Sequence, residues 1–252
     1  MKPNFLGIGA AKAGTTKVAR LLNQHPEVFI SSPKELHYFD SDDPLGKKTT
    51  EWYFSKFEEN VARGEITPSY MFVPGAPKLI HSVLGVDMKF IVSLRNPVDR
   101  AYSHYCHAVN NWHEEKYRER NYPIEELNFR DAITQEPERL ASGEFHIRHQ
   151  SYFKKGVYSE QLERYFEFFP RENFYIYLFE DFIENPSSIM AEMCQFLGVN
   201  DSFKFRNFGE KVNAQTKGSL DLATRTWLSA RYLPDNQKLN DLIGIDVSKW
   251  RV

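Results

Sequence analysis

The sequence has few cysteines and no excess of charge of either sign. Only Cys106 and Cys194 are present among 252 residues, far apart, so the chain shows no disulfide framework. The 32 Lys and Arg are balanced by 34 Asp and Glu, which gives a formal net charge of -2. A protein that binds nucleic acid through its surface charge normally has a strong basic excess. We therefore expect no nucleic-acid partner.

Long apolar runs are also missing. No segment approaches the roughly 20 apolar residues that span a bilayer. The amino end runs from Lys2-Pro3 into Phe5–Ile8, which glycine interrupts too early for a secretory signal. With the low cysteine content, these features predict a cytoplasmic protein without a membrane span. A domain excised from a larger enzyme would have the same features, and nothing in the composition indicates the oligomeric state.

What is present is a globular composition, 41% hydrophobic and 26% charged, in which strand-like and helix-like segments alternate. The expected strands are 5–8, 28–30, a strand ending near 66, 89–94 and 174–179. The expected helices are 15–25, 51–57, one beginning at 97, 157–169 and 187–197. This alternation predicts an α/β fold with a central, mostly parallel sheet flanked by helices. We expect one domain over 1–252, with a polar and aromatic insertion on the substrate side at about 110–155.

A glycine- and alanine-rich loop follows the first expected strand and opens a helix. Residues 9–16 read Gly-Ala-Ala-Lys-Ala-Gly-Thr-Thr. Small residues in this context let backbone N–H groups face an anion, and the helix N-terminus adds partial positive charge. Lys12 contributes a full charge, and Thr15 and Thr16 contribute hydroxyls. A tight turn with a threonine N-cap is the alternative, but the lysine within the loop favours an anion site.

The position of the lysine argues against an ATP or GTP site. Nucleoside triphosphatases carry it directly after the second glycine of this loop. Here Thr15 occupies that position and the lysine lies at Lys12. Nor does a strand end in a magnesium-binding aspartate, because 91–94 leads into Arg95-Asn96.

Four segments in order resemble the sulfotransferases that use 3′-phosphoadenosine 5′-phosphosulfate (PAPS). Residues 9–16 resemble their 5′-phosphosulfate loop. Pro-Lys-Glu-Leu-His-Tyr-Phe-Asp at 33–40 is similar to the Lys-Glu-x-His-Phe-Phe-Asp segment of the heparan-sulfate type and its bacterial relatives. Residues 95–103 resemble the 3′-phosphate site, Arg-[Asn/Asp]-Pro-x-x-Arg-x-x-Ser, and 217–218 resemble a Lys-Gly loop over the cofactor. Segments 64–70 and 156–158 also recur in that family.

The resemblance implies a P-loop-like sulfotransferase fold and transfer of a sulfuryl group from PAPS to an acceptor hydroxyl, leaving adenosine 3′,5′-bisphosphate, without a metal. The residues that it implies for the cofactor are Lys12, Ala13, Gly14, Thr15, Thr16, Lys17, Arg95, Ser103, Tyr158, Lys217, Gly218 and Ser219. Two positions depart from the family pattern. Lys17 replaces an aromatic or aliphatic residue, and Ser219 stands where arginine is frequent.

The resemblance also implies catalytic roles. Glu35 would be the general base and Lys12 would neutralise the leaving group, with His37 and Asp40 lining the acceptor pocket. In an extended segment residues 35 and 37 point to one face, so both would reach one hydroxyl. On its own, Lys34-Glu35 would be read as a solvated surface pair.

Other signals are weaker. His104, Cys106 and His107 lack the number and spacing of zinc ligands, as do His146 and His149. The open acceptor classes are a small molecule, a lipid-like alcohol or a carbohydrate. The alternatives from other classes are a P-loop nucleotide kinase and a non-catalytic nucleotide-binding module. The lysine position and the 95–103 segment argue against the first, and Glu35 argues against the second.

Overall fold

The computed structural model describes residues 1–40, 48–111, 125–143, 149–209 and 219–250. The chain divides into two compact units, which are described separately below: 1–95 with 160–212, and 96–159 with 213–252. Both units are assembled from distant parts of the chain. The expectation of a single domain over 1–252 stays a prediction.

The first unit is built on a five-stranded sheet with the order β2-β3-β1-β4-β5, in which every pair of neighbouring strands is parallel. The strands are β1 (Phe5–Gly9), β2 (Val28–Ile30), β3 (Ala62–Ile66), β4 (Lys89–Leu94) and β5 (Phe174–Leu178). They are almost wholly buried because helices cover both faces, which explains the apolar runs of β1, β2 and β5, whereas β3 contains Arg63 and the buried Glu65. The predicted α/β class with a mostly parallel sheet is confirmed.

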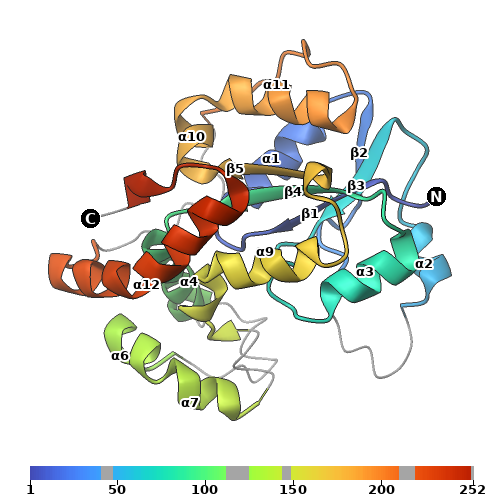
Figure 1. Cartoon of the computed structure of the whole chain (residues 1–252). Helices are drawn as coiled ribbons and strands as arrows, with labels where there is room; N and C mark the ends of the chain where they lie inside the picture. The colour runs from blue at the N-terminus through green and yellow to red at the C-terminus, as the bar shows by residue number, and fades with distance from the viewer. Residues whose placement is uncertain (41–47, 112–124, 144–148, 210–218, 251–252) are drawn as a thin grey trace. The chain divides into compact units, whose positions relative to one another are not determined.

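Helices pack on both faces of this sheet. They are α1 (Thr15–Leu22), α2 (Thr50–Phe54), α3 (Ala76–Leu84), α9 (Tyr158–Phe166), α10 (Phe179–Glu184) and α11 (Pro186–Leu197), with the 3₁₀ turn η2 (Arg171–Asn173). In Figure 1, α1, α10 and α11 lie on one face and α3 and α9 on the other. Leu22 of α1 and Met193 of α11 share one buried core with strand residues. On the other face, Phe90 packs edge-on against Tyr165 and Phe169.

Because the strands are parallel, their carboxyl ends meet at one edge, where open α/β sheets bind ligands. Four chain segments leave the sheet there: 10–14 after β1, 31–40 after β2, 67–70 after β3 and Arg95 after β4. The fold therefore gathers the predicted anion loop, the Glu35 segment and Arg95 at the same edge.

The second unit is helical. It contains α4 (Pro97–Asn111), α6 (Phe129–Thr134), α7 (Glu136–Ala141), η1 (Lys154–Gly156), α12 (Leu222–Ile243) and η3 (Ser248–Trp250). Val98 and Ala101 of α4 share a buried core with Leu228 and Tyr232 of α12. The described parts of the expected insertion at 110–155 lie in this unit, as α6, α7 and η1.

Several boundaries differ from expectation, and α12 has no counterpart in the sequence prediction. Its Leu222 and Leu233 are exposed while Thr224 and Asn236 are buried, so its apolar stripe is weak, and Pro234 reads as a stop. The helix expected over 157–169 ends at Phe166, ahead of Pro170. Within the described ranges no helix combines the length and the apolar character needed to cross a bilayer.

Candidate active site

The loop between β1 and α1 has left-handed backbone at two positions, Lys12 (φ 73°) and Gly14 (φ 79°). Gly14 is the N-cap of α1, and no side chain caps the helix. A Cβ on Gly14 would lie 2.6 Å from a carbon of the Phe179 ring, so both the backbone conformation and the space require glycine.

Strand β4 fixes the shape of this loop. The Ala10 N–H donates to the Ser93 carbonyl (2.7 Å), and the Ser93 hydroxyl donates to the Ala13 carbonyl (2.7 Å). Arg95 Nη1 donates to the Lys12 carbonyl (3.0 Å), with the guanidinium over the Phe179 ring at 5.0 Å. Because the C=O and N–H of a trans peptide point in opposite directions, the Gly14 N–H is directed away from Ser93.

The residues of this loop suit an anion such as a phosphate. Its donors are the Gly14 N–H, the N-terminal dipole of α1, the hydroxyls of Thr15 and Thr16 and the Lys12 ammonium, and the first turn of α1 contains no acidic residue. This donor set fits the phosphosulfate that the family resemblance implies there. Lys17 has a different environment, because its Nζ donates to the Phe208 carbonyl (2.5 Å).

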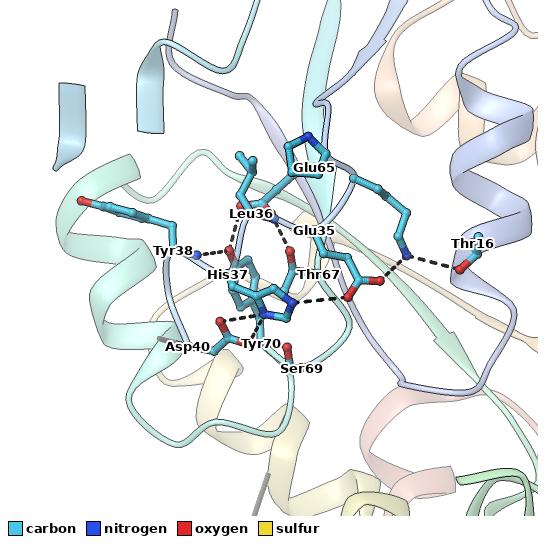
Figure 2. A network of polar contacts seen from close by, with 12 residues as sticks. Thr16, Glu35, Leu36, His37, Tyr38, Asp40, Glu65, Thr67, Ser69 and Tyr70 are labelled. Carbon is cyan, nitrogen blue, oxygen red and sulfur yellow. Dashed lines mark hydrogen bonds and ion pairs between the residues drawn. The ribbon is translucent and has the colours of Figure 1, made fainter. Parts of the chain in front are cut away.

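The Glu35 segment is connected to α1 through a lysine (Figure 2). Lys34 Nζ lies 2.7 Å from Glu35 Oε1 and donates to the Thr16 hydroxyl at 3.5 Å. The predicted base and the first turn of the anion-site helix are therefore joined by one ammonium group. The Glu35 side chain is 39% exposed, so solvent and an acceptor can reach it.

A row of alternating charges continues from Glu35. Its Oε2 lies 3.5 Å from His37 Nε2, and His37 Nδ1 lies 2.9 Å from Asp40 Oδ2. The Ser69 hydroxyl donates to that same Asp40 oxygen. Asp40 is almost fully buried, whereas the His37 side chain is 43% exposed. The structure thus brings Glu35, His37 and Asp40 together, and their roles stay predictions.

These contacts set the protonation states. Hydrogen bonding to Asp40, and then to Glu35, raises the pKa of His37 from 6.5 to about 9. Burial by itself would raise the pKa of Glu35, but its hydrogen bond to His37 and the charge of Lys34 outweigh burial and lower that pKa to about 2. At neutral pH Glu35 is therefore a carboxylate, the form that accepts a proton, and His37 is an imidazolium.

One expectation about this segment is wrong. The chain is not extended at His37, whose φ is 51°, in the left-handed region. The contact between residues 35 and 37 therefore arises from a turn and not from the alternation of a strand.

The sequence reasoning missed residues that hold the segments in place. Ser93 supports the anion loop, Ser69 supports Asp40, and the buried Glu65 binds the backbone at Leu36. Glu65 and Ser69 lie in the 64–70 segment that matched the family but received no role. The available signal was a charged residue, Glu65, inside a predicted strand and two positions before Thr67-Pro68.

The other predicted cofactor residues belong to the second unit, and two of them lie outside the described residues. Ser103 is buried on α4. Tyr158 is buried, its N–H donates to Asp235 (2.9 Å), and its ring lies 6.0 Å from that of Trp250. Ser219 is exposed, and residues 217–218 lie outside the described residues. No group of three His, Cys, Asp or Glu suited to a metal occurs among the described residues.

A parallel sheet with an anion-suited loop between its first strand and first helix is the arrangement of phosphate-binding α/β proteins. Comparison with known families identifies which of them this is. The family model described as "Sulfotransferase domain" matches residues 2–225, so the chain belongs to the sulfotransferase domain family.

Individual relatives agree with this assignment. A solved sulfotransferase from Alicyclobacillus acidocaldarius is similar over 100% of both chains, with a TM-score of 0.83 and 30% identity. The membrane-associated sulfotransferase kil1 of Dictyostelium discoideum is 26% identical over 99% of this chain and 66% of its own length. Human heparan sulfate glucosamine 3-O-sulfotransferase 5 is 26% identical over 96% of this chain and 72% of its own length. Both curated relatives are therefore longer than this chain.

Proposed function

We propose that this sulfotransferase moves a sulfuryl group from PAPS to an acceptor hydroxyl, with Glu35 as the general base. The observation that carries the proposal is the connection of Glu35 through Lys34 to Thr16 at the start of α1. It brings a group able to take a proton and a loop suited to an anion to the same edge of the sheet. Reactants held in this way need little covalent help from the protein.

The loop between β1 and α1 would bind the sulfuryl donor. When bound, PAPS supplies the sulfuryl group and carries the adenosine 3′,5′-bisphosphate that leaves. Gly14, Thr15 and Thr16 would hold its 5′-phosphate with Ala13, and Lys12 would neutralise the charge that builds there as the bond from sulfur to the phosphate oxygen breaks. For the 3′-phosphate and the nucleoside, the family resemblance supports Arg95, Ser103, Tyr158, Lys217, Gly218 and Ser219. It also implies Lys17 for the cofactor.

On the acceptor side, Glu35 would take the hydroxyl proton as the bond between the acceptor oxygen and sulfur forms. His37 holds one Glu35 oxygen and Lys34 the other, so the carboxylate is fixed in orientation before the acceptor arrives. His37 and Asp40 would contribute to the acceptor site. The acceptor classes are a small molecule, a lipid-like alcohol or a carbohydrate, and the name of the human relative, a heparan sulfate glucosamine 3-O-sulfotransferase, supports testing sugars.

The nucleotide site can be tested before the acceptor is known. Adenosine 3′,5′-bisphosphate at about 100 times its dissociation constant should add about 2.7 kcal/mol to the free energy of unfolding. A thermal-shift titration would measure this beside ATP with magnesium. Stabilisation by the bisphosphate alone supports the proposal. Stabilisation by ATP and magnesium alone would favour the nucleotide kinase.

The base is tested by Glu35→Gln, which keeps the shape but cannot accept the proton. Turnover should fall roughly 10²–10⁴-fold, while the affinity for adenosine 3′,5′-bisphosphate changes little. The assay follows PAPS conversion with whichever alcohol, phenol or sugar of a test panel reacts fastest. Glu51→Gln, on the exposed start of α2, is the matched control. Full activity of Glu35→Gln would remove Glu35 from this role, and nucleotide binding without turnover of any acceptor would favour the non-catalytic module.

A further inference from the structure

Directly behind the Glu35 segment lies a carboxylate that takes no part in the chemistry proposed above. Glu65, near the end of β3, has no exposed surface. Its Oε2 accepts hydrogen bonds from the Leu36 N–H (2.9 Å) and the Thr67 hydroxyl (2.5 Å). Its Oε1 accepts from the hydroxyls of Tyr53 and Tyr70, both at 2.8 Å. Burial raises the pKa of Glu65, and the four hydrogen-bond donors oppose that rise because they favour the ionised form.

Tyr70 extends this carboxylate toward His37. The Tyr70 hydroxyl accepts a hydrogen bond from the Tyr38 N–H (2.8 Å) and donates its own proton to Glu65. The N–H groups of Leu36 and Tyr38 lie on either side of His37 in the sequence. The Leu36 N–H donates directly to Glu65, and the Tyr38 N–H is linked to Glu65 through the Tyr70 hydroxyl. Figure 2 shows Glu65 and Tyr70 beside this stretch of chain.

The backbone at His37 needs such support. Its left-handed conformation is unfavourable for a residue with a Cβ and persists only where the surroundings impose it. Lys48 Nζ holds the carbonyl side, donating to Leu36 O (3.1 Å) and His37 O (2.8 Å). Glu65 and Tyr70 hold the N–H side.

We propose that Glu65 and Tyr70 are positioning residues, which fix the turn at His37 so that its imidazole lies between Glu35 and Asp40. This inference rests on the proposed function, because it concerns the same site. It assigns neither residue a contact with substrate.

The chain offers a matched pair of variants. Tyr70→Phe and Tyr53→Phe each remove one buried hydroxyl from the same Glu65 oxygen. Only Tyr70 also binds the backbone beside His37. Tyr53 is buried and its ring stacks on that of Tyr38 at 4.4 Å, a contact that phenylalanine keeps. Any difference between the variants beyond general destabilisation therefore reports on positioning.

The first readout is the titration of His37 by NMR of its ring nitrogens, which needs no acceptor. Among the described residues, the charged groups facing His37 are Glu35 and Asp40, with Lys34 behind Glu35 and Lys48 at the His37 carbonyl. In Tyr70→Phe we expect the pKa of His37 to move from about 9 toward its ordinary 6.5, as the ring loses its fixed contacts. In Tyr53→Phe it should stay close to the wild-type value. An unshifted His37 in Tyr70→Phe would overturn the proposal.

The second readout is turnover of PAPS with the best acceptor of the panel. In Tyr70→Phe, kcat should fall about tenfold or more because the base is misplaced, while the KM for PAPS changes less than about twofold. Tyr53→Phe should keep kcat within about twofold. Equal kcat losses in the two variants would show a purely structural role and overturn the proposal. If Tyr70→Phe does not fold, Glu65→Gln, which keeps the shape but cannot satisfy all four donors, takes its place with the same expected outcomes.

Failure of this inference is distinguishable from failure of the proposed function. If Glu35→Gln abolishes turnover while Tyr70→Phe matches Tyr53→Phe in both readouts, Glu35 keeps its role and the positioning residues lose theirs. If the Tyr70→Phe titration shifts while Glu35→Gln stays fully active, the positioning of His37 stands and the base is elsewhere.

Discussion

Replacing Asp40 by asparagine removes the negative charge that holds His37 in its protonated form. Asp40 is the larger of the two acidic influences that raise the pKa of His37 from 6.5 to about 9. With a pKa of 9, about 97% of the imidazole is protonated at pH 7.5, and with a pKa of 6.5 only about 9%. Glu35 remains in Asp40→Asn, so we expect an intermediate pKa, near or below about 7.5. The ring then changes from almost fully charged to about half charged or less.

NMR titration of the His37 ring between pH 5.5 and 10 measures this directly. Ser69→Ala is the control, because it removes a hydrogen bond to Asp40 and leaves the charge of Asp40 in place. Its His37 should keep a pKa well above 6.5. A wild-type His37 that titrates near 6.5, or an Asp40→Asn variant with a pKa still near 9, would refute the electrostatic account of the site.

The same change alters how stability depends on pH. The folded-state pKa of His37 lies above its unfolded value, so protonation contributes stability that is fully present below about pH 6.5 and is lost as the pH rises through about 9. The thermal midpoint of the wild type should fall over this window. In Asp40→Asn the part due to His37 should be lost at lower pH and be smaller. Parallel curves for the two proteins would contradict this.

Two further predictions concern the anion loop. Gly14→Ala forces an L-residue into left-handed backbone and a methyl group against the Phe179 ring, so it should lower the free energy of unfolding by about 1–2 kcal/mol or more and weaken adenosine 3′,5′-bisphosphate binding, as checked by urea unfolding and calorimetry. Lys12→Ala should weaken that binding and also lower turnover, because the charge acts on the 5′-phosphate in both the bound and the transition state. A variant of Lys12 that changed neither would show that the loop assignment is wrong.

The parts of the fold that the sequence predicted well are those where local signals agree. Strands 28–30 and 89–94 match β2 and β4, because each is an apolar run closed by polar residues and proline. The helix ending at Leu197 was marked by Gly198, which adopts the left-handed C-cap conformation. Helix α12 was missed because it buries some polar residues and exposes two leucines. Packing within the second unit determines which of its residues are buried, so its hydrophobic residues do not recur with a clear helical period.

In the candidate site, too, the residues marked by local signals were predicted and those held by distant contacts were not. Lys12 and the threonines of the anion loop could be recognised because the strand, loop and helix that make up the site are contiguous. Glu35 and His37 came from the family resemblance, and their contact was expected for the wrong backbone reason. The supports were not predictable, since Glu65 reaches Leu36 across 29 residues and Ser93 reaches Ala13 across 80. The order of the strands in the sheet decides which loops lie side by side at its carboxyl edge, and a local sequence pattern does not reveal that order.

The alternation of charge explains why these distant supports matter. Lys34, Glu35, His37 and Asp40 form a row of positive and negative groups in which each charge lies beside one of opposite sign. The formal charges of two basic and two acidic side chains sum to zero, so each charge in the row can be balanced by its neighbour as long as the distances hold. Loss of any inner member leaves a neighbour unbalanced and shifts its pKa. The backbone that sets the spacing at His37 is therefore as important to the ionised form of Glu35 as the charges themselves.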